Sequence, residues 1–599
     1  MKIFFCCSII YSVNVLYIYG GRPMRYFLKK STPSKKGLYL QIYQSCYIPG
    51  KGARNKSYKA IGYYNDLVEK GISDPIKHAQ DIIDGLNKDI PNKRGQKIGD
   101  VSFKRNLGHF LLKSTWDYLG LSNDIDVITG NRNSRFRMSD FILAMIGAQV
   151  VNPGSKHNAF EKVMPSLYGS PAFSYDQILD AVNYIGDDYQ KFIEVMNHHV
   201  KKRFPRKTEK AFFDCTNYYF EIDLPKNDRQ MGPSKEERHL PIIGQALLLD
   251  EEQIPIGMSL YPGNQSEKPE IRNSIENLKS RFDIDSKIVQ VADKGLNCAR
   301  NIYAASVEAE DGYIFSKSVH GKSLSAQEKK WVLSSDDGPN RWAEVKDQNG
   351  KLIFRYKECV DDFEYRFTDD AGNAVSFRVK EKRVVSYNPS LARKQMAQIQ
   401  RQVDKASRIS TIKQSSKSDY GDSAKYVNFV PVDKDGGIAE VRAALNQAKI
   451  DEDMAFAGYN LLVSSEIDKP ALDIYGTYHG LWRIEESFRV MKTYLEARPV
   501  YLQKTESIYG HFTICYLALT LLRVLELKAF GDALPIGQLI SFIRNYSITE
   551  TPDGSFINNA CKSAVLDAVK KRYSLSKLDN AYLRKKDVDN ILNAELFFD

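Results

Sequence analysis

A carboxylate, an aromatic hydroxyl and two cations share one stripe of the segment 478–492, YHGLWRIEESFRVMK. Glu485 lies one helical turn before Arg489 and two turns before Lys492. Tyr478 lies two turns before that carboxylate. The spacing predicts one amphipathic helix over the whole segment. The stripe can be a solvated ladder of ion pairs, which are common at i,i+4 on helices, or a metal-binding carboxylate flanked by cations that bind phosphate.

The same segment has a separate apolar face. Its members recur at spacings of three and four residues: Leu481, Ile484, Phe488, Met491 and Leu495. We expect this face to pack into a core, and we expect Trp482 to be buried as well.

Two further acids stand in strand-like segments. Asp214 lies inside the aromatic-rich segment 209–223, where a carboxylate is costly unless it is paired or binds a metal. Asp293 ends the apolar segment KIVQVAD, and ligands bind at the carboxyl ends of strands in open α/β sheets. Either acid alone can be structural. With Glu485 they offer three hard oxygen ligands of the kind that Mg²⁺ or Mn²⁺ prefers.

The elements that must position these acids begin after Pro205. The pattern predicts strand, strand, strand, helix, strand, helix and strand in that order. The pattern gives bounds for all of these elements except the second helix: 209–223, 242–249, 255–261, 268–281, 287–293 and 311–319. A long polar segment at 321–455 contains short alternating strands and separates them from a strand at 455–468.

Composition narrows the class of protein. A chain of 599 residues is too long for one core, so we expect several domains. The net charge of +11, from 85 Lys and Arg against 74 Asp and Glu, favours a polyanionic partner. The eight cysteines are scattered without the paired spacing of a zinc site or a disulfide framework. This cysteine usage favours a cytoplasmic protein.

The first residues differ from the rest of the chain. Residues 3–20 are uncharged and mostly apolar, which is typical of a signal or a short membrane anchor. We favour an over-extended reading frame over 1–23, because Met24 begins a more ordinary start. Beyond it, the β-rich segment 38–64 predicts a hairpin around a basic turn, and its lysines and arginine are candidate DNA contacts.

The order of the three acids, with a long insertion before the glutamate, resembles the ribonuclease H-like core of Asp-Asp-Glu (DDE) transposases. More narrowly, it resembles bacterial insertion-sequence transposases with a β-rich insertion and the signature Tyr-x2-Arg-x3-Glu-x6-Lys. Tyr478, Glu485 and Lys492 match that signature, whereas Leu481 stands at the arginine position. The contexts DCT and VADKGLN, and the segments GPSKEERHLPIIGQALLLD and YPGNQSE, also look like those of the family.

The resemblance implies roles for these residues. Asp214, Asp293 and Glu485 would be catalytic and would hold Mg²⁺ or Mn²⁺, as two ions. Tyr478 and Lys492 would contact DNA phosphates. As a hypothesis, Arg489 or Arg483 supplies the DNA-binding cation that is missing at the arginine position.

The predicted fold class is α/β, with a ribonuclease H-like catalytic core, a β-rich insertion between the second Asp and the Glu, and N-terminal DNA-binding and helical regions. The predicted divisions are a leader or over-extended start at 1–23, a DNA-binding region at 24–130, a helical region at 131–205, the catalytic core at 206–320 and 456–530, the insertion at 321–455, and a C-terminal helical region at 531–599.

The implied function is a transposase that cuts DNA at the terminal inverted repeats of its element and joins the 3′-hydroxyl ends to target DNA. Its partner would be double-stranded DNA, bound by a homodimer, with no small-molecule substrate. The alternatives are an inactive or regulatory DNA-binding relative, or a metal-dependent nuclease with the same core. The alternative of a membrane-anchored protein is supported only by residues 3–20.

Overall fold

The computed structural model describes residues 25–32, 37–48, 52–88, 104–130, 136–235, 239–282, 287–321, 323–334, 341–410, 420–432, 440–551 and 554–597. The leader predicted over 1–23 lies outside these residues. The chain divides into two compact units. The first holds the described residues up to Arg105, with Ile548–Asn559 and Asn580–Asp589, and the second holds most of the remainder.

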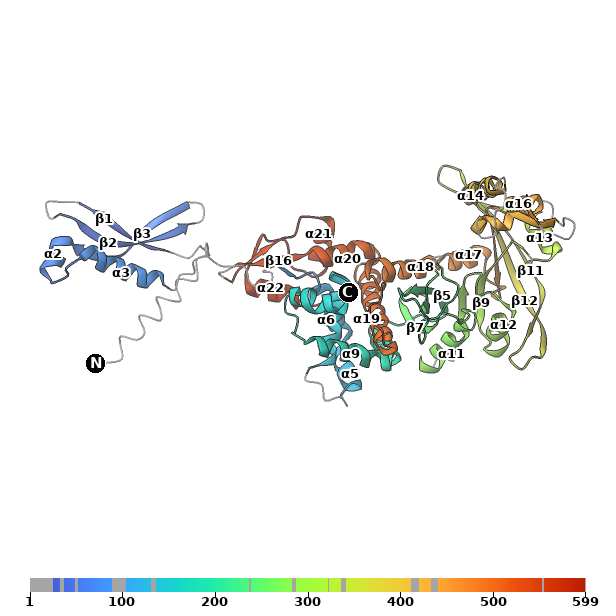
Figure 1. The fold of residues 1–599 in the computed structure, drawn as a ribbon, viewed down its shortest axis with the longest axis horizontal. Coiled ribbons are helices and arrows are strands. Elements are labelled where there is room, and N and C mark those ends of the chain that lie inside the picture. The colour runs from blue at the N-terminus through green and yellow to red at the C-terminus, as the bar shows by residue number, and fades with distance from the viewer. Residues whose placement is uncertain are drawn as a thin grey trace. The chain divides into compact units, whose positions relative to one another are not determined.

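The first unit contains a three-stranded antiparallel sheet in the order β1-β2-β3 (Figure 1). Its elements are β1 (Tyr26–Ser31), β2 (Tyr39–Ile48), β3 (Gly52–Tyr63), α2 (Tyr64–Glu69) and α3 (Pro75–Asn87). Leu40 and Ile42 are fully buried on the side of the sheet that the helices cover. The side chain of Asp74 caps α3 by accepting hydrogen bonds from the Ile76 and Lys77 amides. The predicted hairpin is therefore confirmed, and β1 adds a strand that the pattern did not predict.

The second unit begins with helices that pack around one long apolar helix. The long helix is α19 (Thr505–Val524), and α4 (Phe110–Leu119), α6 (Met138–Val151), α9 (Tyr175–Asp187) and α10 (Tyr189–Arg203) pack against it. Helix α5 (Leu121–Ile128) packs against α4, α6 and α10. Gly510 of α19 lies so close to α9 that an added Cβ would meet the Val182 carbonyl oxygen at 1.9 Å. The segment Thr505–Ala529 is long and apolar enough to cross a membrane, but 94% of its apolar window is buried inside the protein. It is therefore a helix of the core.

A nine-stranded mixed sheet forms the centre of the second unit, in the order β10-β11-β12-β15-β9-β8-β5-β6-β7. The strands are β5 (Lys210–Tyr219), β6 (Ile242–Leu249), β7 (Pro255–Pro262), β8 (Val289–Ala292), β9 (Gly312–Lys317), β10 (Ala343–Lys346), β11 (Leu352–Thr368), β12 (Ala374–Tyr387) and β15 (Tyr459–Ser464). Strand β6 is antiparallel to both of its neighbours, β5 and β7, whereas β8 and β9 run parallel to β5. The predicted strands are confirmed, and the fold is mixed α/β.

Helices cover both faces of this sheet. On one face, α11 (Glu270–Phe282) and α12 (Ala299–Tyr303) pack against Phe213 and Cys215. On the other face lie α17 (Ala471–His479) and α18 (Trp482–Arg489), as Figure 1 shows. Because strand side chains alternate between faces, Asp214 points toward the side of α17 and α18.

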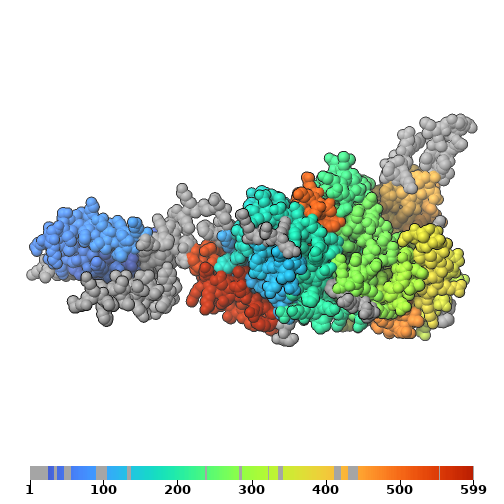
Figure 2. Space-filling model, turned by 90° about the horizontal axis from the view of Figure 1, so that it is seen from below, coloured from blue at the N-terminus to red at the C-terminus, as the bar shows by residue number. Residues whose placement is uncertain are grey.

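The predicted insertion extends the same sheet. The hairpin β11–β12 pairs with β15 through β12, and β15 pairs with β9. Figure 2 shows the yellow hairpin packed against the green core strands. Beyond the hairpin follow α14 (Pro389–Ser410), β13 (Val427–Val432), β14 (Glu440–Leu445) and α16 (Gln447–Ala455).

The C-terminal region is less helical than predicted. Besides α20 (Ile536–Asn545), α21 (Ala564–Arg572) and α22 (Lys585–Leu592), it contains β16 (Ser547–Glu550), β17 (Phe556–Asn558) and β18 (Tyr582–Leu583). These strands form a small sheet in the order β18-β17-β16-β4, with β4 at Lys104–Asn106.

A buried carboxylate joins the insertion to the core sheet. Glu381 of β12 has no exposed surface and accepts hydrogen bonds from the hydroxyls of Tyr313 at 2.6 Å and Tyr365 at 2.9 Å. Arg383 pairs with the same carboxylate at 3.2 Å and also contacts Glu328. Since Tyr313 belongs to β9, this cluster ties the hairpin to the core.

We predict that Glu381→Ala destabilises the protein by about 3–5 kcal/mol, because Arg383 and two tyrosine hydroxyls lose their buried partner. Urea denaturation followed by circular dichroism measures the change. Glu364→Ala, which removes an exposed acid from the same hairpin, is the control and should cost less than about 1 kcal/mol. Equal losses in the two variants would contradict the proposed junction.

Candidate active site

The first acid lies near the middle of β5. Asp214 sits between Phe213 and Cys215, which are buried on the opposite face. Its neighbours on its own face are fixed by close packing: Phe212 lies against Gly480, and the Tyr218 ring lies 4.7 Å from that of Phe512. The carboxylate therefore lies on the face of β5 that contacts α18.

The second acid arrives on the neighbouring parallel strand. The ladder between β5 and β8 pairs Phe213 with Ala292, so Asp293 follows one step beyond, beside Asp214. Adjacent strands are about 4.8 Å apart, which brings the two carboxylates together. Asp293 itself is exposed at the end of its strand.

This proximity changes the acidity of the first carboxyl. The pKa of Asp214 is raised to about 6, chiefly by burial and also by the charges of Asp293 and Glu267, while the Lys235 ammonium and the Cys215 amide oppose the shift. The Cys215 amide donates to Asp214 Oδ1 at 2.7 Å. Ionisation of Asp214 is therefore unfavourable in the folded protein, and a bound cation would offset that cost.

The segment 478–492 is not one helix, so that prediction is wrong. Helix α17 ends at His479, α18 begins at Trp482, and a π-helical turn follows over Val490–Tyr494. The chain tightens at Gly480, where an added Cβ would meet the Phe212 ring at 2.8 Å. Close packing against Phe212 thus leaves no room for a Cβ at this position, and i→i+3 hydrogen bonds from the Gly480 and Leu481 amides join the two helices.

The break still brings Tyr478 and Glu485 to the aspartates. The Tyr478 hydroxyl donates a hydrogen bond to Asp293 Oδ1 at 2.9 Å. Burial, and then the charges of Asp293 and Glu485, raise the pKa of Tyr478 above its usual range. Glu485 is exposed and close enough to Tyr478 for its charge to act on that hydroxyl. Tyr478 therefore contacts Asp293 directly and lies within reach of the Glu485 charge, while Asp293 acts on Asp214.

The donor set suits a hard divalent cation, but the acids do not form a finished ligand shell. Within the described part of the chain, no three His, Cys, Asp or Glu side chains are grouped closely enough to hold a metal ion. Carboxylate oxygens are the ligands that Mg²⁺ and Mn²⁺ prefer. Metal binding would therefore require the carboxylates to move closer together.

Two residues beside Asp214 were not among the predicted site residues. Lys235 contacts the Cys215 carbonyl oxygen and forms an ion pair with Glu267 at 3.2 Å. Burial lowers the pKa of Lys235, but the charges of Asp214 and Glu267 outweigh burial and raise it. Both residues come from loop segments whose periodicity carries no signal, so only the fold brings them to the site.

The predicted phosphate ligand Lys492 also reaches this space. Its Nζ lies 5.2 Å from the centre of the Tyr218 ring. Burial and the nearby Lys235 ammonium lower the pKa of Lys492 to about 8, while Asp214 opposes the shift. Two ammonium groups therefore lie beside the buried carboxylate, and an anionic phosphate would relieve their mutual repulsion.

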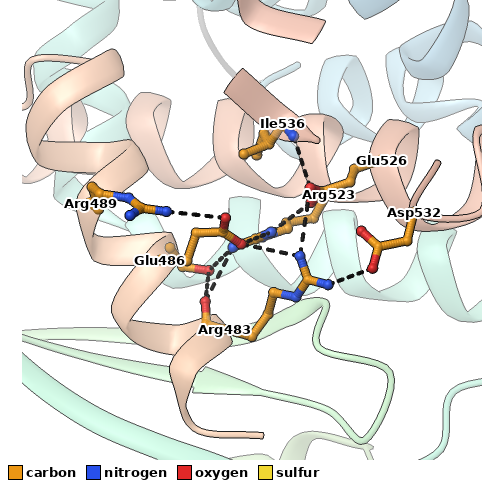
Figure 3. Close-up of polar contacts among 8 residues, drawn as sticks. Arg483, Glu486, Arg489, Arg523, Glu526, Asp532 and Ile536 are labelled. Atoms are coloured by element: carbon orange, nitrogen blue, oxygen red, sulfur yellow. Dashed lines mark hydrogen bonds and ion pairs between the residues drawn. The ribbon is translucent and has the colours of Figure 1, made fainter. Parts of the chain in front are cut away.

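The arginines of α18 belong to a different network, which Figure 3 shows. Glu486 accepts hydrogen bonds from Arg483 at 3.1 Å, Arg489 at 3.2 Å and Arg523 at 2.9 Å. Arg523 is fully buried and also pairs with Glu526 at 2.6 Å. The ladder partner of Arg489 is thus Glu486 and not Glu485.

Exposure separates the two candidate arginines. Arg483 is buried and also pairs with Asp532 at 2.8 Å, so its guanidinium is committed inside the protein. The side chain of Arg489 is 64% exposed, which leaves it accessible to a phosphate. Trp482 is 52% exposed, and the prediction of a core position for it is wrong. Its ring lies against the Arg483 guanidinium at 4.1 Å instead.

Comparison of the whole chain with protein-family models and with curated proteins gives no match.

Glu485 and Glu486 are neighbours in the sequence, and comparing their variants separates a residue of the proposed site from one that stabilises the fold. We predict that Glu486→Ala lowers the free energy of unfolding by about 3–5 kcal/mol, because the buried Arg523 loses a partner. Glu485→Ala, at an exposed position, should change it by less than about 0.5 kcal/mol. Urea denaturation of both variants tests this, and a large loss for Glu485→Ala would place that residue in the scaffold.

The raised pKa of Asp214 predicts a pH-dependent stability. Its folded value of about 6 lies above the ordinary 3.8, so ionisation costs the folded state about 3 kcal/mol above pH 6 and nothing below pH 3.8. Asp214→Asn should therefore stabilise the protein at pH 8 in EDTA, and the gain should disappear near pH 4. Urea midpoints across this range test it, with the exposed Asp223→Asn as the control. A gain that does not vary with pH would contradict the burial argument.

Proposed function

We propose that this protein is a metal-dependent DDE transposase that cuts DNA at the ends of its element and joins the 3′-hydroxyl ends to target DNA. The observation that supports the proposal is the placement of Asp293 beside Asp214 on neighbouring parallel strands. The Tyr478 hydroxyl donates to Asp293, and Glu485 is near enough for its charge to act on Tyr478.

The sheet supports a ribonuclease H-like core. In the order β7-β6-β5-β8-β9, three antiparallel strands are followed by two parallel ones. The first acid lies on the central strand and the second follows its parallel neighbour. This is the arrangement that the sequence resemblance implies for the catalytic core.

The acids would hold Mg²⁺ or Mn²⁺. Two such ions, when bound, stabilise negative charge on the attacking and leaving oxygens of a phosphodiester. The chain supplies the remaining parts of the site. Tyr478 holds Asp293 in place through its hydroxyl, and the buried Glu486 network holds the helix that carries Glu485.

Both steps would be phosphoryl transfers without a covalent enzyme intermediate. In the first, the oxygen of a water molecule bonds to phosphorus, the P–O3′ bond breaks, and the 3′ oxygen takes up a proton. In the second, that 3′-hydroxyl loses its proton and attacks a phosphorus of target DNA, where another P–O3′ bond breaks. Lys492 and Lys235, whose charges interact with that of Asp214, and the exposed Arg489 would neutralise phosphate oxygens.

The test uses purified full-length protein, Mg²⁺ or Mn²⁺, and duplex DNA that carries the sequences flanking the gene. We expect metal-dependent cutting and joining, and we expect Asp214→Asn and Glu485→Gln each to lower the rate at least about 100-fold. Denaturing gels that resolve 3′-hydroxyl ends and joined products measure both steps. The stability of Glu485→Gln provides the control for folding.

The other outcomes identify the alternatives. Binding without cutting by the parent chain would indicate a regulatory relative. Cutting without end specificity or joining would indicate a nuclease. Because two ends must be held together, we propose a homodimer on DNA, in the cytoplasm.

A further inference from the structure

The three-stranded sheet of the first unit has one face covered and one face open. Leu40 and Ile42 point into the covered face, under α2 and α3. By alternation, Tyr39, Gln41 and Tyr43 lie on the opposite face, and all three are partly exposed. The open face therefore presents hydroxyl and amide groups and aromatic rings.

Strand pairing continues this polar surface onto the neighbouring strands. Gln41 Nε2 donates to Ser57 Oγ at 2.5 Å, and the rings of Tyr39 and Tyr63 meet edge-on with centres 4.9 Å apart. Lys29 lies opposite Gln41, and its Nζ sits 4.6 Å from the centre of the Tyr43 ring. The rings pack against one another and against a cation, so they form a supported surface.

Charge is segregated between the strands and the helices. The three strands carry five basic residues and no acidic one: Lys29, Lys30, Arg54, Lys56 and Lys59. Helices α2 and α3 carry four acids against one lysine: Asp66, Glu69, Asp81, Asp84 and Lys77. A polyanion is therefore attracted to the sheet and repelled by the helices.

The cations lie on the two outer strands. The central strand β2 has no charged residue, whereas β1 and β3 carry all five cations. Lys30, Lys56 and Lys59 alternate toward the helix side, but they are exposed on the outer strands, where long side chains can reach round the edge. Lys29 therefore shares the open face, and the exposed lysines of the outer strands lie at both edges of the neutral polar strip.

We propose that this open face enters the major groove of duplex DNA, with β2 against the base edges and the lysines of β1 and β3 on the two phosphate backbones. The backbones of the outer strands are about 10 Å apart, close to the width of about 12 Å of the major groove, in which strands of other β-sheet proteins bind. A single-stranded nucleic acid has only one phosphate chain, so it would not account for cations on both outer β-strands. The inference rests on the proposed function for its choice of DNA over other polyanions.

The test measures binding of full-length protein, in EDTA, to a fluorescein-labelled 30-base-pair duplex of mixed sequence. A variant combining Lys29→Ala, Lys56→Ala and Lys59→Ala should bind at least about tenfold more weakly, and its log affinity should fall less steeply with log salt, by about 2.7. Fluorescence anisotropy at several salt concentrations gives both quantities. Gln41→Ala should weaken binding at least about fivefold and leave the salt slope unchanged, because it removes a contact to bases.

The matched control removes the same charge from the helix layer. Lys70→Ala, Lys77→Ala and Lys88→Ala together leave the sheet intact, since all three lysines are exposed on or beside α2 and α3. We expect this control to keep the parent affinity and slope within about twofold. Equal loss in both triple variants would overturn the proposal, as would an unchanged slope in the sheet variant.

Two further probes decide the kind of nucleic acid. A 30-nucleotide single strand and a 30-base-pair RNA duplex should both bind more weakly than duplex DNA, and tighter binding of either would overturn the groove assignment. The result is separable from the proposed catalysis. If the parent chain cuts DNA but the sheet variant binds like the parent, only the sheet proposal fails. If the sheet variant loses binding but the parent never cuts, only the catalytic proposal fails.

Discussion

Arg523 has no exposed surface, and its guanidinium contacts four groups that fix the position of α18. It pairs with Glu486 and Glu526, and it donates to the Arg483 carbonyl and the Ser487 hydroxyl. Adjacent helix positions differ by about 100°, so holding Glu486 inward leaves Glu485 exposed, within reach of Tyr478. A buried ion network contributes little net stability, but it is strongly directional. Apolar residues could fill the same volume without defining the rotation of this helix.

The carboxylates of the proposed site, unlike the Arg523 network, lower the stability of the folded protein. Burial and Asp293 raise the pKa of Asp214, so the folded protein carries a charge that it would hold more easily elsewhere. Such local cost is common where a site needs charge in a fixed place. The two ammonium groups of Lys235 and Lys492 relieve part of it. The site is thus built from charges that oppose one another, and a phosphate with its metal ions would complete the balance.

The insertion and the N-terminal sheet illustrate two ways of adding to such a core. The insertion joins the central sheet through β12 and the Glu381 cluster, so it shares the rigidity of the strands that carry Asp214 and Asp293. The N-terminal sheet has its own small core around Leu40 and Ile42 and leaves a polar face open. Rigid extension suits the support of a reaction centre, whereas a separate face suits recognition.

The sequence by itself determined the strands, because local periodicity and flanking residues record them. It did not reveal the junction at Gly480 or the burial of Arg483, and it wrongly predicted a core position for Trp482. Lys235 and Glu267 lie in segments that resemble those of the family, but no periodicity marked them as neighbours of Asp214. These features depend on contacts between segments far apart in the chain, such as the packing of Gly480 against Phe212 and the pairing of Glu486 with Arg523. Only the tertiary structure places Asp293 beside Asp214 and the Tyr478 hydroxyl on Asp293, because these contacts depend on strand register and helix packing.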